Sequence, residues 1–435
     1  MSEPQDISRP WYSGITTYQW LVLLIASLGW IFDVFEGQIF VACMNEAMPE
    51  LLGPEATKGD VSFYNNMALA AFLVGGAIGG VAFGMLSDRI GRIRTMILTI
   101  LVYSMFTFLQ AFSQNAWQLI GLRLLVAAGV GGEWAVASAL VAEVFPKHAR
   151  AWSAAIFHSS SVLGIWVAVL VGKLIVPEPD LGWRWAFAVG VLPALLTVWV
   201  YRSLHEPEQW TEARKAASDQ GRVVARPRLS DLFAPELVRN TLVGLALATV
   251  GLATFWSVYI QGWNLVRELA EANQLAWQPK DAEMMGMFLV SVGGGVGLLS
   301  CGPLCNWLGR RGTFLLFCLG GVVSAVLLFQ VLPRGPLWLL WPSLPIFGYF
   351  TTGMHAGYAV YFPELFPTRL RGTGGGFCFN GARLTAAPIL ILSGYMRKTL
   401  DISLGDTATI LGLLLLLGAI VLLFAPETKG RDLPT

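Results

Sequence analysis

The sequence predicts an all-α membrane protein with twelve transmembrane helices, arranged as two pseudo-symmetric six-helix bundles. Three observations support this fold class. Only 13% of the 435 residues are charged, about half of the roughly 25% that is typical of soluble domains. Apolar runs of about 20 residues, the length that crosses the hydrocarbon core of a bilayer, recur along the chain. The third observation is an internal repeat that relates the two halves.

Twelve apolar windows account for the predicted helices. The first six lie at 18–43, 62–86, 94–113, 117–144, 151–176 and 184–203. The other six lie at 240–263, 284–308, 313–333, 337–362, 372–396 and 406–425. The polar segment 204–239 separates the two sets. We therefore expect one bundle over 1–203, a linker loop over 204–239 and a second bundle over 240–435.

Lys and Arg residues gather on one side of the predicted helices, which sets the orientation of a membrane protein. If the N-terminus is cytoplasmic, 19 of the 29 Lys and Arg residues fall in cytoplasmic segments and eight in outer ones. The remaining two, Arg123 and Arg383, lie inside spans. The sequence thus predicts a multi-pass protein of the inner or plasma membrane, with both termini and the linker loop in the cytoplasm.

Two motifs recur in both halves. "GMLSDRIGRIRT" at 84–95 aligns with "GPLCNWLGRRGT" at 302–313, and "AEVFPKHAR" at 142–150 aligns with "PELFPTRLR" at 363–371. Upstream of the first pair, Gly75, Gly76 and Gly79 recur as Gly293, Gly294 and Gly297. Small residues allow close helix packing in lipid. Two like halves with a substrate site between them are the plan of several transporter folds.

Charged residues in these motifs predict a gate on the cytoplasmic side. Asp88 can pair with a nearby Arg, and Glu143 and Glu364 lie beside Arg150 and Arg371. Such pairs would hold the bundles together and break when this side opens. A simple topology lock is the alternative. The expected gate consists of Asp88, Arg92, Glu143, Arg150, Arg310, Glu364 and Arg371.

The motifs resemble those of a known family. "GMLSDRIGRIRT" resembles the loop 2–3 signature of the major facilitator superfamily, and "RLLVAAGVGGEWAVASALVAEVFPKHARA" at 123–151 resembles its span-4 pattern. "YFPELFPTRLRGTG" and "PETKGR" are similar to motifs of its sugar-porter and metabolite/proton symporter branches. The resemblance covers essentially the whole chain. It implies two six-helix bundles that work by alternating access.

Two further stretches resemble one branch of that superfamily. "GWIFDVFEGQIF" at 29–40 is similar to the first span of organic-acid/proton symporters, although Glu36 stands where that group has a second Asp. Arg383 in "FNGARLTAAP" resembles the span-11 arginine of the same group. Span 7, "LATFWSVYIQGW", lacks the closely spaced Gln pair of sugar porters. The resemblance therefore favours an organic acid over a sugar.

Intramembrane charges are the candidate proton-coupling groups. Charges inside a span cost several kcal/mol and usually line an aqueous path or pair with one another. Three acids, Asp33, Glu36 and Glu133, face only Arg123 and Arg383. Burial and neighbouring like charges favour a neutral carboxyl, so at least one acid should take up a proton near neutral pH. The alternative is that Asp33 and Glu36 only make polar contacts between helices or face outer water.

Arg383 is the main candidate for binding substrate. It lies about halfway along span 11 and could hold a carboxylate by a forked pair of hydrogen bonds. A permanent salt bridge to Glu133 or Asp33 is the alternative for Arg383, and core packing is the alternative for the aromatic residues. The expected binding set is Arg383, Asn380, Arg123, His158, Ser161, His355, Tyr358, Trp256 and Tyr259.

These features predict a secondary transporter that moves a small organic anion with protons. A proton-coupled exporter, a facilitative sugar carrier and a membrane sensor on a transporter scaffold are the alternatives. The sequence has no Walker-A loop, Ser/His/Asp set or metal-ligand cluster, so we expect no enzymatic activity, cofactor or metal. A net charge of +1 gives no basis for nucleic-acid binding. We expect a monomer whose partners are its substrate, protons and the lipid bilayer.

Overall fold

The computed structural model describes residues 12–146, 149–178, 180–206, 211, 229–272, 275–367 and 370–429, apart from some side chains inside helices. Most of these residues are helical, and the described part contains no strand. The first half contains α1 (Thr17–Leu52), α2 (Lys58–Ile90), α3 (Arg92–Gln110), α4 (Ala116–Val144), α5 (Arg150–Ser159), α6 (Ser161–Leu174), α7 (Gly182–Val189) and α8 (Ala194–Ser203).

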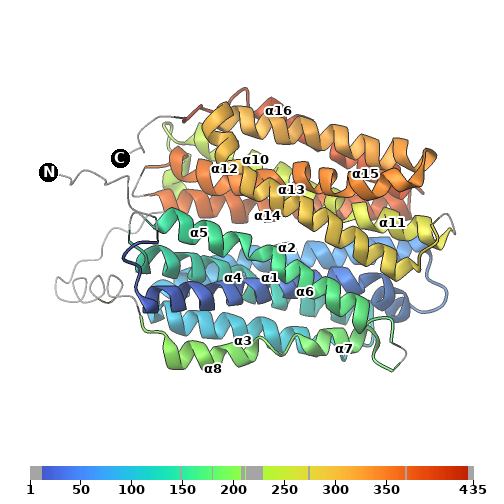
Figure 1. Ribbon diagram of the computed structural model, residues 1–435, viewed down its shortest axis with the longest axis horizontal. Helices are drawn as coiled ribbons and strands as arrows, with labels where there is room; N and C mark the ends of the chain where they lie inside the picture. The colour runs from blue at the N-terminus through green and yellow to red at the C-terminus, as the bar shows by residue number, and fades with distance from the viewer. Residues whose placement is uncertain are drawn as a thin grey trace.

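The second half contains longer helices and several short 3-10 or π segments. Its elements are η1 (Leu229–Phe233), α10 (Val238–Thr254), η2 (Phe255–Tyr259), α11 (Gln261–Glu271), α12 (Pro279–Val326), η3 (Leu327–Val331), η4 (Leu332–Arg334), η5 (Leu337–Leu339), α13 (Leu340–Leu365), α14 (Arg371–Lys398), α15 (Leu404–Gly412) and α16 (Leu414–Val421). Figure 1 shows the blue-to-green helices on one side and the yellow-to-red helices on the other, all roughly parallel to one long axis.

We name the two ends of the molecule after the predicted orientation. The inner end is the one at which α1 begins and α16 ends, and the outer end is the opposite one, where α7 and α11 lie (Figure 1). Ten helical segments of the described chain are long and apolar enough to cross a membrane. The other two predicted spans are α4, with 29 residues, and α13, with 26. The predicted fold class is confirmed.

Two predicted spans are longer than their apolar windows. The window that ends at 43 belongs to a helix that continues to Leu52. The window that ends at 263 belongs to a helical segment that continues to Glu271. Charged residues in both extensions, among them Glu46 and Arg267, lower the hydropathy. The helices continue because these charges pair with one another.

The repeated glycines bring equivalent helices into contact in both halves. A Cβ atom at Gly79 of α2 would lie 1.9 Å from the carbonyl oxygen of Ala128 on α4. A Cβ atom at Gly293 of α12 would lie 1.8 Å from the carbonyl oxygen of Pro345 on α13. No larger side chain fits either contact. The packing expected from the repeat is therefore present in both halves.

The two repeated turns at the inner end are built alike. Gly91 has a φ of 111° and Gly309 a φ of 77°, values that favour glycine. Behind Gly91, the Glu206 carboxylate accepts hydrogen bonds from the backbone N–H of Arg92 at 2.7 Å and of Ile93 at 3.1 Å. Behind Gly309, Glu427 accepts from Arg310 at 3.0 Å and Arg311 at 3.1 Å. Gly309 lies at a kink inside α12, where its non-helical backbone separates two helical segments. Each carboxylate therefore caps the start of the helical segment that follows its glycine.

Candidate functional site

The three predicted proton-coupling acids are buried within the first half. Asp33 and Glu36 on α1 are 1% and 0% exposed, and Glu133 on α4 is 0% exposed. The Thr99 hydroxyl on α3 donates a hydrogen bond to Glu133 at 2.6 Å. A Cβ atom at Gly29 of α1 would lie 2.8 Å from Glu133 Oε1. Glu133 therefore occupies a space between α1, α3 and α4.

Asp33 and Glu36 are close in sequence but have different neighbours. Asp33 interacts electrostatically with Glu133 and with Arg383 of the second half. Glu36 lies against α7, since a Cβ atom at Gly190 would be 3.1 Å from its Oε1. Neither carboxyl has a hydrogen-bond partner among the described residues. Asp33 is thus the acid nearer the boundary between the halves.

Arg123 lies deep inside the first half. Its guanidinium donates to the backbone carbonyls of Glu36 at 3.0 Å and of Gly37 at 3.2 Å. The guanidinium carbon also lies 4.7 Å from the ring centre of Phe40 and 4.3 Å from that of Phe72. These contacts hold α4 against α1 and α2.

Arg383 and Asn380 project from α14 toward glycines of α2. A Cβ atom at Gly76 would lie 2.2 Å from Arg383 Nη1, and one at Gly80 would lie 3.1 Å from Asn380 Oδ1. Arg383 is half-buried, and its Nε has no hydrogen-bond partner among the described residues. Both Asp33 oxygens also lack a partner there, so Arg383 and Asp33 form no salt bridge in this structure.

Aromatic and imidazole rings from both halves surround this position. Trp134 of α4 stacks on Phe379 of α14 with ring centres 5.6 Å apart. His158 lies 5.9 Å from Trp134 on the first half. The Arg383 guanidinium lies 5.5 Å from the centre of the Phe379 ring. The structure therefore places a cation beside the aromatic faces that join the two halves.

The rings of the second half continue this cluster. His355 lies 5.3 Å from Phe255 and 5.5 Å from Tyr358. Its Nδ1 is 3.0 Å from the Thr352 carbonyl, whereas its Nε2 has no partner among the described residues. The Tyr358 hydroxyl donates to the Leu247 carbonyl at 2.9 Å. His355 therefore keeps a free ring nitrogen, and the Tyr358 hydroxyl serves packing against α10.

The remaining binding candidates are Trp256, Tyr259 and Ser161. Trp256 is 5.5 Å from Phe72 of α2, and Tyr259 stacks on Phe255 at 4.7 Å. Both rings belong to η2, a π-helical turn within span 7, which sequence spacing does not reveal. Ser161 is partly buried and begins α6 after a break in span 5.

Part of the predicted cytoplasmic gate is described. Arg310 donates to Glu364 at 2.6 Å and 3.0 Å, and the Thr428 hydroxyl donates to the same carboxylate at 2.5 Å. Both Arg310 and Glu364 belong to the second half, so this pair ties α12 to α13. Arg92 donates to Ser87 Oγ at 3.0 Å. The side chains of Asp88, Glu143, Arg150 and Arg371 lie outside the described residues.

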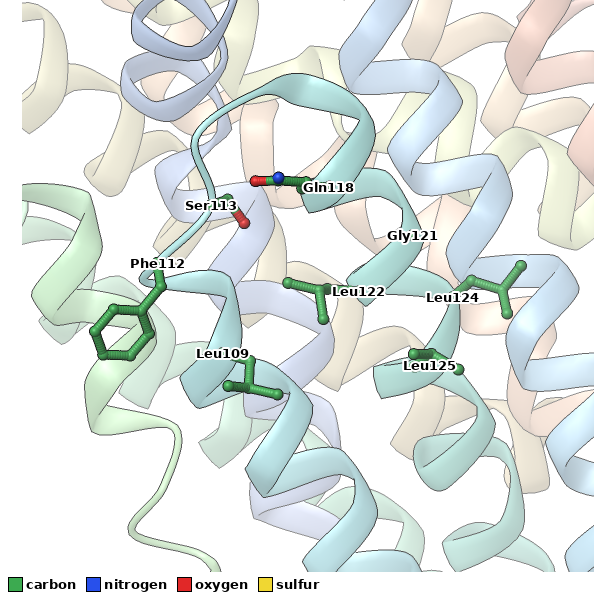
Figure 2. A pocket seen from close by; sticks show the side chains of 8 residues that line it. All are labelled: Leu109, Phe112, Ser113, Gln118, Gly121, Leu122, Leu124 and Leu125. Carbon is green, nitrogen blue, oxygen red and sulfur yellow. The ribbon is translucent and has the colours of Figure 1, made fainter.

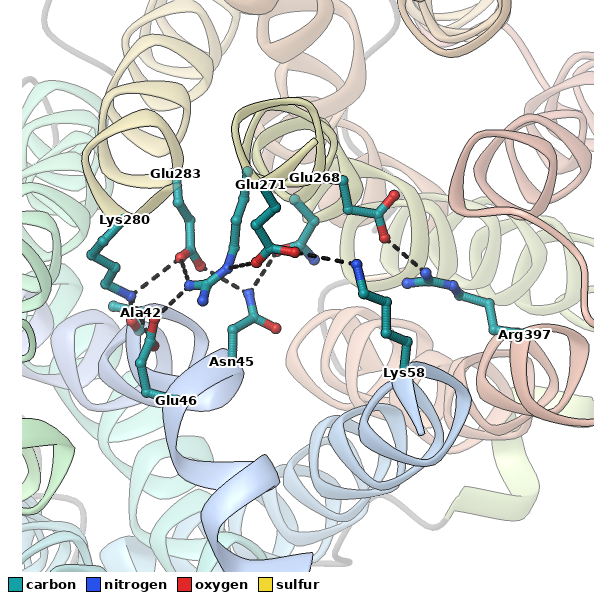
Figure 3. A network of polar contacts seen from close by, with 11 residues as sticks. Ala42, Asn45, Glu46, Lys58, Glu268, Glu271, Lys280, Glu283 and Arg397 are labelled. Atoms are coloured by element: carbon teal, nitrogen blue, oxygen red, sulfur yellow. Dashed lines mark hydrogen bonds and ion pairs between the residues drawn. The ribbon is translucent and has the colours of Figure 1, made fainter. Parts of the chain in front are cut away.

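An ion-pair network at the outer end was not predicted from the sequence (Figure 3). Arg267 of α11 pairs with Glu46 of α1, with Glu283 of α12 at 2.6 Å and with Glu271 at 2.9 Å. Lys280 pairs with Glu46 at 3.0 Å and with Glu283 at 3.2 Å. We call Glu46, Arg267, Lys280 and Glu283 the outer network. It joins the two halves, and its Glu283 is fully buried.

The sequence contained a weak signal for the outer network. Its four members lie just outside three apolar windows, where Arg267 and Lys280 count among the outer basic residues and Glu46 and Glu283 carry no further prediction. The pairing requires the ends of α1 and α11 to lie beside the start of α12, and the sequence does not specify this arrangement. These residues are therefore functional candidates that only the structure identifies.

A surface hollow at the outer end lies apart from all these groups. It has a volume of about 520 Å³ and is lined mainly by apolar side chains of α3 and α4, including Leu109, Leu122 and Leu125. Figure 2 shows Ser113 and Gln118 next to each other at the turn above them. None of the predicted site residues lines it.

Comparison with known proteins identifies similar chains. The family model described as Major Facilitator Superfamily matches residues 27–387. A cis,cis-muconate transport protein of Acinetobacter baylyi is 29% identical, over 77% of this chain and 78% of that protein. A protein of Cupriavidus pinatubonensis described as a probable 4-methylmuconolactone transporter is 28% identical, over 97% of this chain and 93% of that protein.

A solved structure has the same fold. The crystal structure of a D-xylose-proton symporter matches with a TM-score of 0.79 and covers 96% of this chain and 100% of that one. Sequence identity is 18%. At that identity the match concerns the arrangement of helices alone.

Proposed function

We propose that this chain, which belongs to the Major Facilitator Superfamily, moves a small organic anion across the membrane together with protons. Membership of that family makes it a multi-pass membrane transporter and not an enzyme. The observation that carries the finer proposal is the meeting of Asp33 and Arg383 between the halves, where both charged groups interact electrostatically without forming a salt bridge.

The proposed coupling follows from competition for one cation. While Asp33 is ionised, its negative charge balances that of Arg383. When Asp33 takes up a proton, Arg383 loses this counter-charge and attracts a substrate carboxylate more strongly. Binding of the proton and binding of the anion then favour each other, which is the linkage that a symporter requires. Glu36 and Glu133 are the further acids of the proposed proton-coupling set.

The substrate is proposed to be a carboxylate. Arg383 presents planar donors that suit a carboxylate group, and Asn380 lies on the same helix beside Gly80. Trp134 and Phe379 offer apolar faces nearby. The relatives named for cis,cis-muconate and 4-methylmuconolactone support this class. The rest of the proposed binding set is Arg123, His158, Ser161, His355, Tyr358, Trp256 and Tyr259.

Alternating access requires a gate at each end. We propose that the outer network closes the outer end, because it joins α1 to α11 and α12 across the two halves. The inner gate is proposed to consist of Asp88, Arg92, Glu143, Arg150, Arg310, Glu364 and Arg371.

The proposed units of the chain are the bundles over 1–203 and 240–435 and a cytoplasmic linker over 204–239. The proposed setting is the cell membrane, with both termini inside and a monomeric chain.

A ligand-binding experiment tests the substrate class. The purified chain is heated with cis,cis-muconate, nicotinate, N-acetylneuraminate or D-xylose, since a ligand that binds the folded state raises the unfolding temperature. We expect stabilisation by at least one carboxylate, none by D-xylose, and loss of the effect in Arg383→Gln. Stabilisation by D-xylose alone, or an undiminished carboxylate effect in Arg383→Gln, contradicts the proposal.

A further inference from the structure

One face of α3 carries a continuous line of buried polar residues. Thr95, Thr99, Tyr103, Thr107 and Gln110 are all 0% exposed. Their spacing of three or four residues places them above one another on a single helix face. A buried polar group without a partner costs free energy. Packing between membrane helices alone would therefore favour apolar residues at these positions. We call these five residues the α3 polar face.

The polar groups toward the outer end of this face are unpaired. The Thr95 hydroxyl donates to the Gly91 carbonyl at 2.7 Å, the usual arrangement for a threonine inside a helix. By contrast, the Tyr103 hydroxyl, the Thr107 hydroxyl and both amide atoms of Gln110 have no hydrogen-bond partner in the described part of the chain. The unpaired groups therefore lie in succession along more than one helical turn.

The three proposed proton-coupling acids lie along the α3 polar face. Glu133 accepts a hydrogen bond from Thr99. The Tyr103 hydroxyl interacts electrostatically with Glu133, Asp33 and Glu36. Farther out, a Cβ atom at Gly190, the residue that follows α7, would meet both the Thr107 methyl group at 2.4 Å and Glu36 Oε1 at 3.1 Å. Glu36 thus has neighbours on the α3 polar face and not at the boundary between the halves.

The outer end of the face reaches the molecular surface. The next polar residue beyond Gln110 is Ser113, whose hydroxyl is also buried and unpaired among the described residues. Arg184 donates to the Ser113 carbonyl at 3.0 Å, and its side chain is 41% exposed. Gln118, exposed at the same turn, lies next to Ser113 in Figure 2. The line of polar groups therefore runs from solvent-exposed residues to the acids.

We propose that the α3 polar face conducts protons from the outer end of the first half to Glu36, Asp33 and Glu133. This inference rests on the proposed proton coupling. Water molecules bridging the unpaired groups would complete the path. A proton that enters at Ser113 protonates Glu36. The Tyr103 hydroxyl then gives its own proton to Asp33 or Glu133 and takes up a second proton from the bridging water on its outer side. Tyr103 is neutral before and after, and the ionised acid becomes neutral.

The path is separate from the route of the substrate. The substrate site lies between the halves, and the outer network closes that space at the outer end. The α3 polar face lies inside the first half, between α3, α4, α1 and α7, with Arg123 as the buried cation nearest Glu36. Protons can therefore exchange with the outside while the substrate route is closed, which would load the acids before the anion arrives.

The experiment measures how fast the buried carboxyls take up protons. The full chain is reconstituted in vesicles with its outer end facing the bath, the bath is acidified rapidly, and carboxyl protonation is followed by infrared difference spectroscopy. The variants are Tyr103→Phe and Thr107→Val, with Gln110→Leu as a third variant should one fail to fold. Thr407→Val is the matched control, because Thr407 is equally buried and unpaired but lies on α15 of the second half.

We expect protonation to slow about tenfold or more in the α3 variants and to keep the wild-type rate in Thr407→Val, since each variant removes a hydrogen-bonding group from the path. Equal rates in all proteins overturn the path, as does equal slowing in Thr407→Val. Absence of any carboxyl protonation in the wild-type chain overturns the proposed proton coupling itself. The two failures are therefore distinguishable.

Discussion

Arg383 depends on a residue of the opposite half for its position. Its guanidinium lies beside the Phe379 ring and over Gly76 of α2, where an added Cβ atom would be 2.2 Å from Nη1. The glycine therefore does more than allow two helices to approach. It also leaves the space that the Arg383 guanidinium occupies at the boundary between the halves.

Gly76→Ala should weaken carboxylate binding while leaving the chain folded. The added methyl group displaces the end of a flexible side chain and not a backbone segment, so stability should change little. Charge-assisted hydrogen bonds are worth about 1.5–3 kcal/mol, so the dissociation constant should rise about tenfold or more. Gly121→Ala is the control, because a Cβ atom there meets nothing within 4 Å. Equal affinities in both variants and the wild type would contradict the role of Gly76.

Asp33→Asn and Glu36→Gln should differ in effect. Asp33 faces Arg383, so Asp33→Asn fixes the site in its proton-loaded form and should abolish accumulation driven by a pH gradient. Counterflow of bound anion should persist, because it requires no proton release. Glu36 has its neighbours inside the first half, at Thr107, Gly190 and Arg123, so Glu36→Gln should slow uptake and keep accumulation. Measuring accumulation and counterflow in both variants tests whether the two acids differ in role. Normal accumulation by Asp33→Asn would be incompatible with the proposed coupling.

The charged residues of the site could be predicted from the sequence, but their neighbours could not. A charge inside an apolar run stands out, which identified Asp33, Glu133 and Arg383. The difference between Asp33 and Glu36 depends on how α1 is rotated against α3 and α14. The contact of Arg383 with Gly76 depends on the packing of α14 against α2. Both are tertiary relations that spacing along the chain does not encode.

At the scale of elements, the same turn is constructed twice at the inner end. In each half a glycine with positive φ ends one helix, and a carboxylate caps the start of the next. A Cβ atom at Gly91 would lie 2.2 Å from Glu206 Oε1, and one at Gly309 would lie 2.8 Å from Glu427 Oε2. The glycine is therefore required both by the backbone and by the incoming carboxylate. The repeat predicted the two turns but not the acids that cap them, which come from distant segments.

Glu427→Gln should reduce stability in a pH-dependent way. Partial burial raises the pKa of Glu427, but the backbone N–H groups of Lys429, Arg310, Arg311 and Thr428 outweigh it and hold the pKa below the ordinary 4.5. Because the pKa of Glu427 is lower in the folded state, its ionised carboxylate stabilises the folded protein above pH 4.5. This stabilisation is lost as the pH falls through the pKa that Glu427 has in the folded state. The variant should therefore cost about 1 kcal/mol at neutral pH, a typical value for a helix cap.

The measurement is thermal unfolding of wild type and Glu427→Gln at neutral and acidic pH. The difference between them should shrink as the pH falls below 4.5. Glu236→Gln, at an exposed glutamate of the same half, is the control and should have no effect at either pH. A difference that stays constant or grows on acidification would rule out the capping role.

The lengths of the helices were predicted less well than their number. The twelve apolar windows correspond to ten segments that are long and apolar enough to cross a membrane and to the helices α4 and α13, because length and apolar character are local properties. Hydropathy ended the first span at 43 and the seventh at 263, whereas the helical segments extend to Leu52 and Glu271. The charged ends of these helices are stable because Glu46 meets Arg267 across the halves, which is not a local property.

At the scale of the whole molecule, the outer network holds the two halves together. Removing Arg267 leaves the fully buried Glu283 with Lys280 as its one remaining cation in the outer network, and a buried charge that is less well compensated destabilises the arrangement that holds it. Arg267→Gln should therefore favour opening at the outer end. Cys43 is buried on α1 close to Lys280, Glu46 and Glu283, so it reports on that opening.

Arg267→Gln should make Cys43 react faster with a membrane-impermeant thiol reagent applied to the outer end. Lys173→Gln is the control, because the Lys173–Asp281 pair is at the same end but largely exposed, at 51% and 43%. Exposed pairs contribute little, so this control should behave as wild type. Mass spectrometry of Cys43 measures the rate. Unchanged reactivity in Arg267→Gln would mean that the outer network does not act as a gate.

Coupled movement of an organic anion and protons through this molecule can be measured in one experiment. The coupling is tested most directly by recording the uptake of labelled cis,cis-muconate and the internal pH of proteoliposomes together. With no proton gradient imposed, we expect inward movement of muconate down its own gradient to acidify the interior, and we expect an inward proton gradient to drive accumulation above the external concentration. Muconate entry without acidification, at a rate and final level independent of the proton gradient, would contradict the proposed coupling.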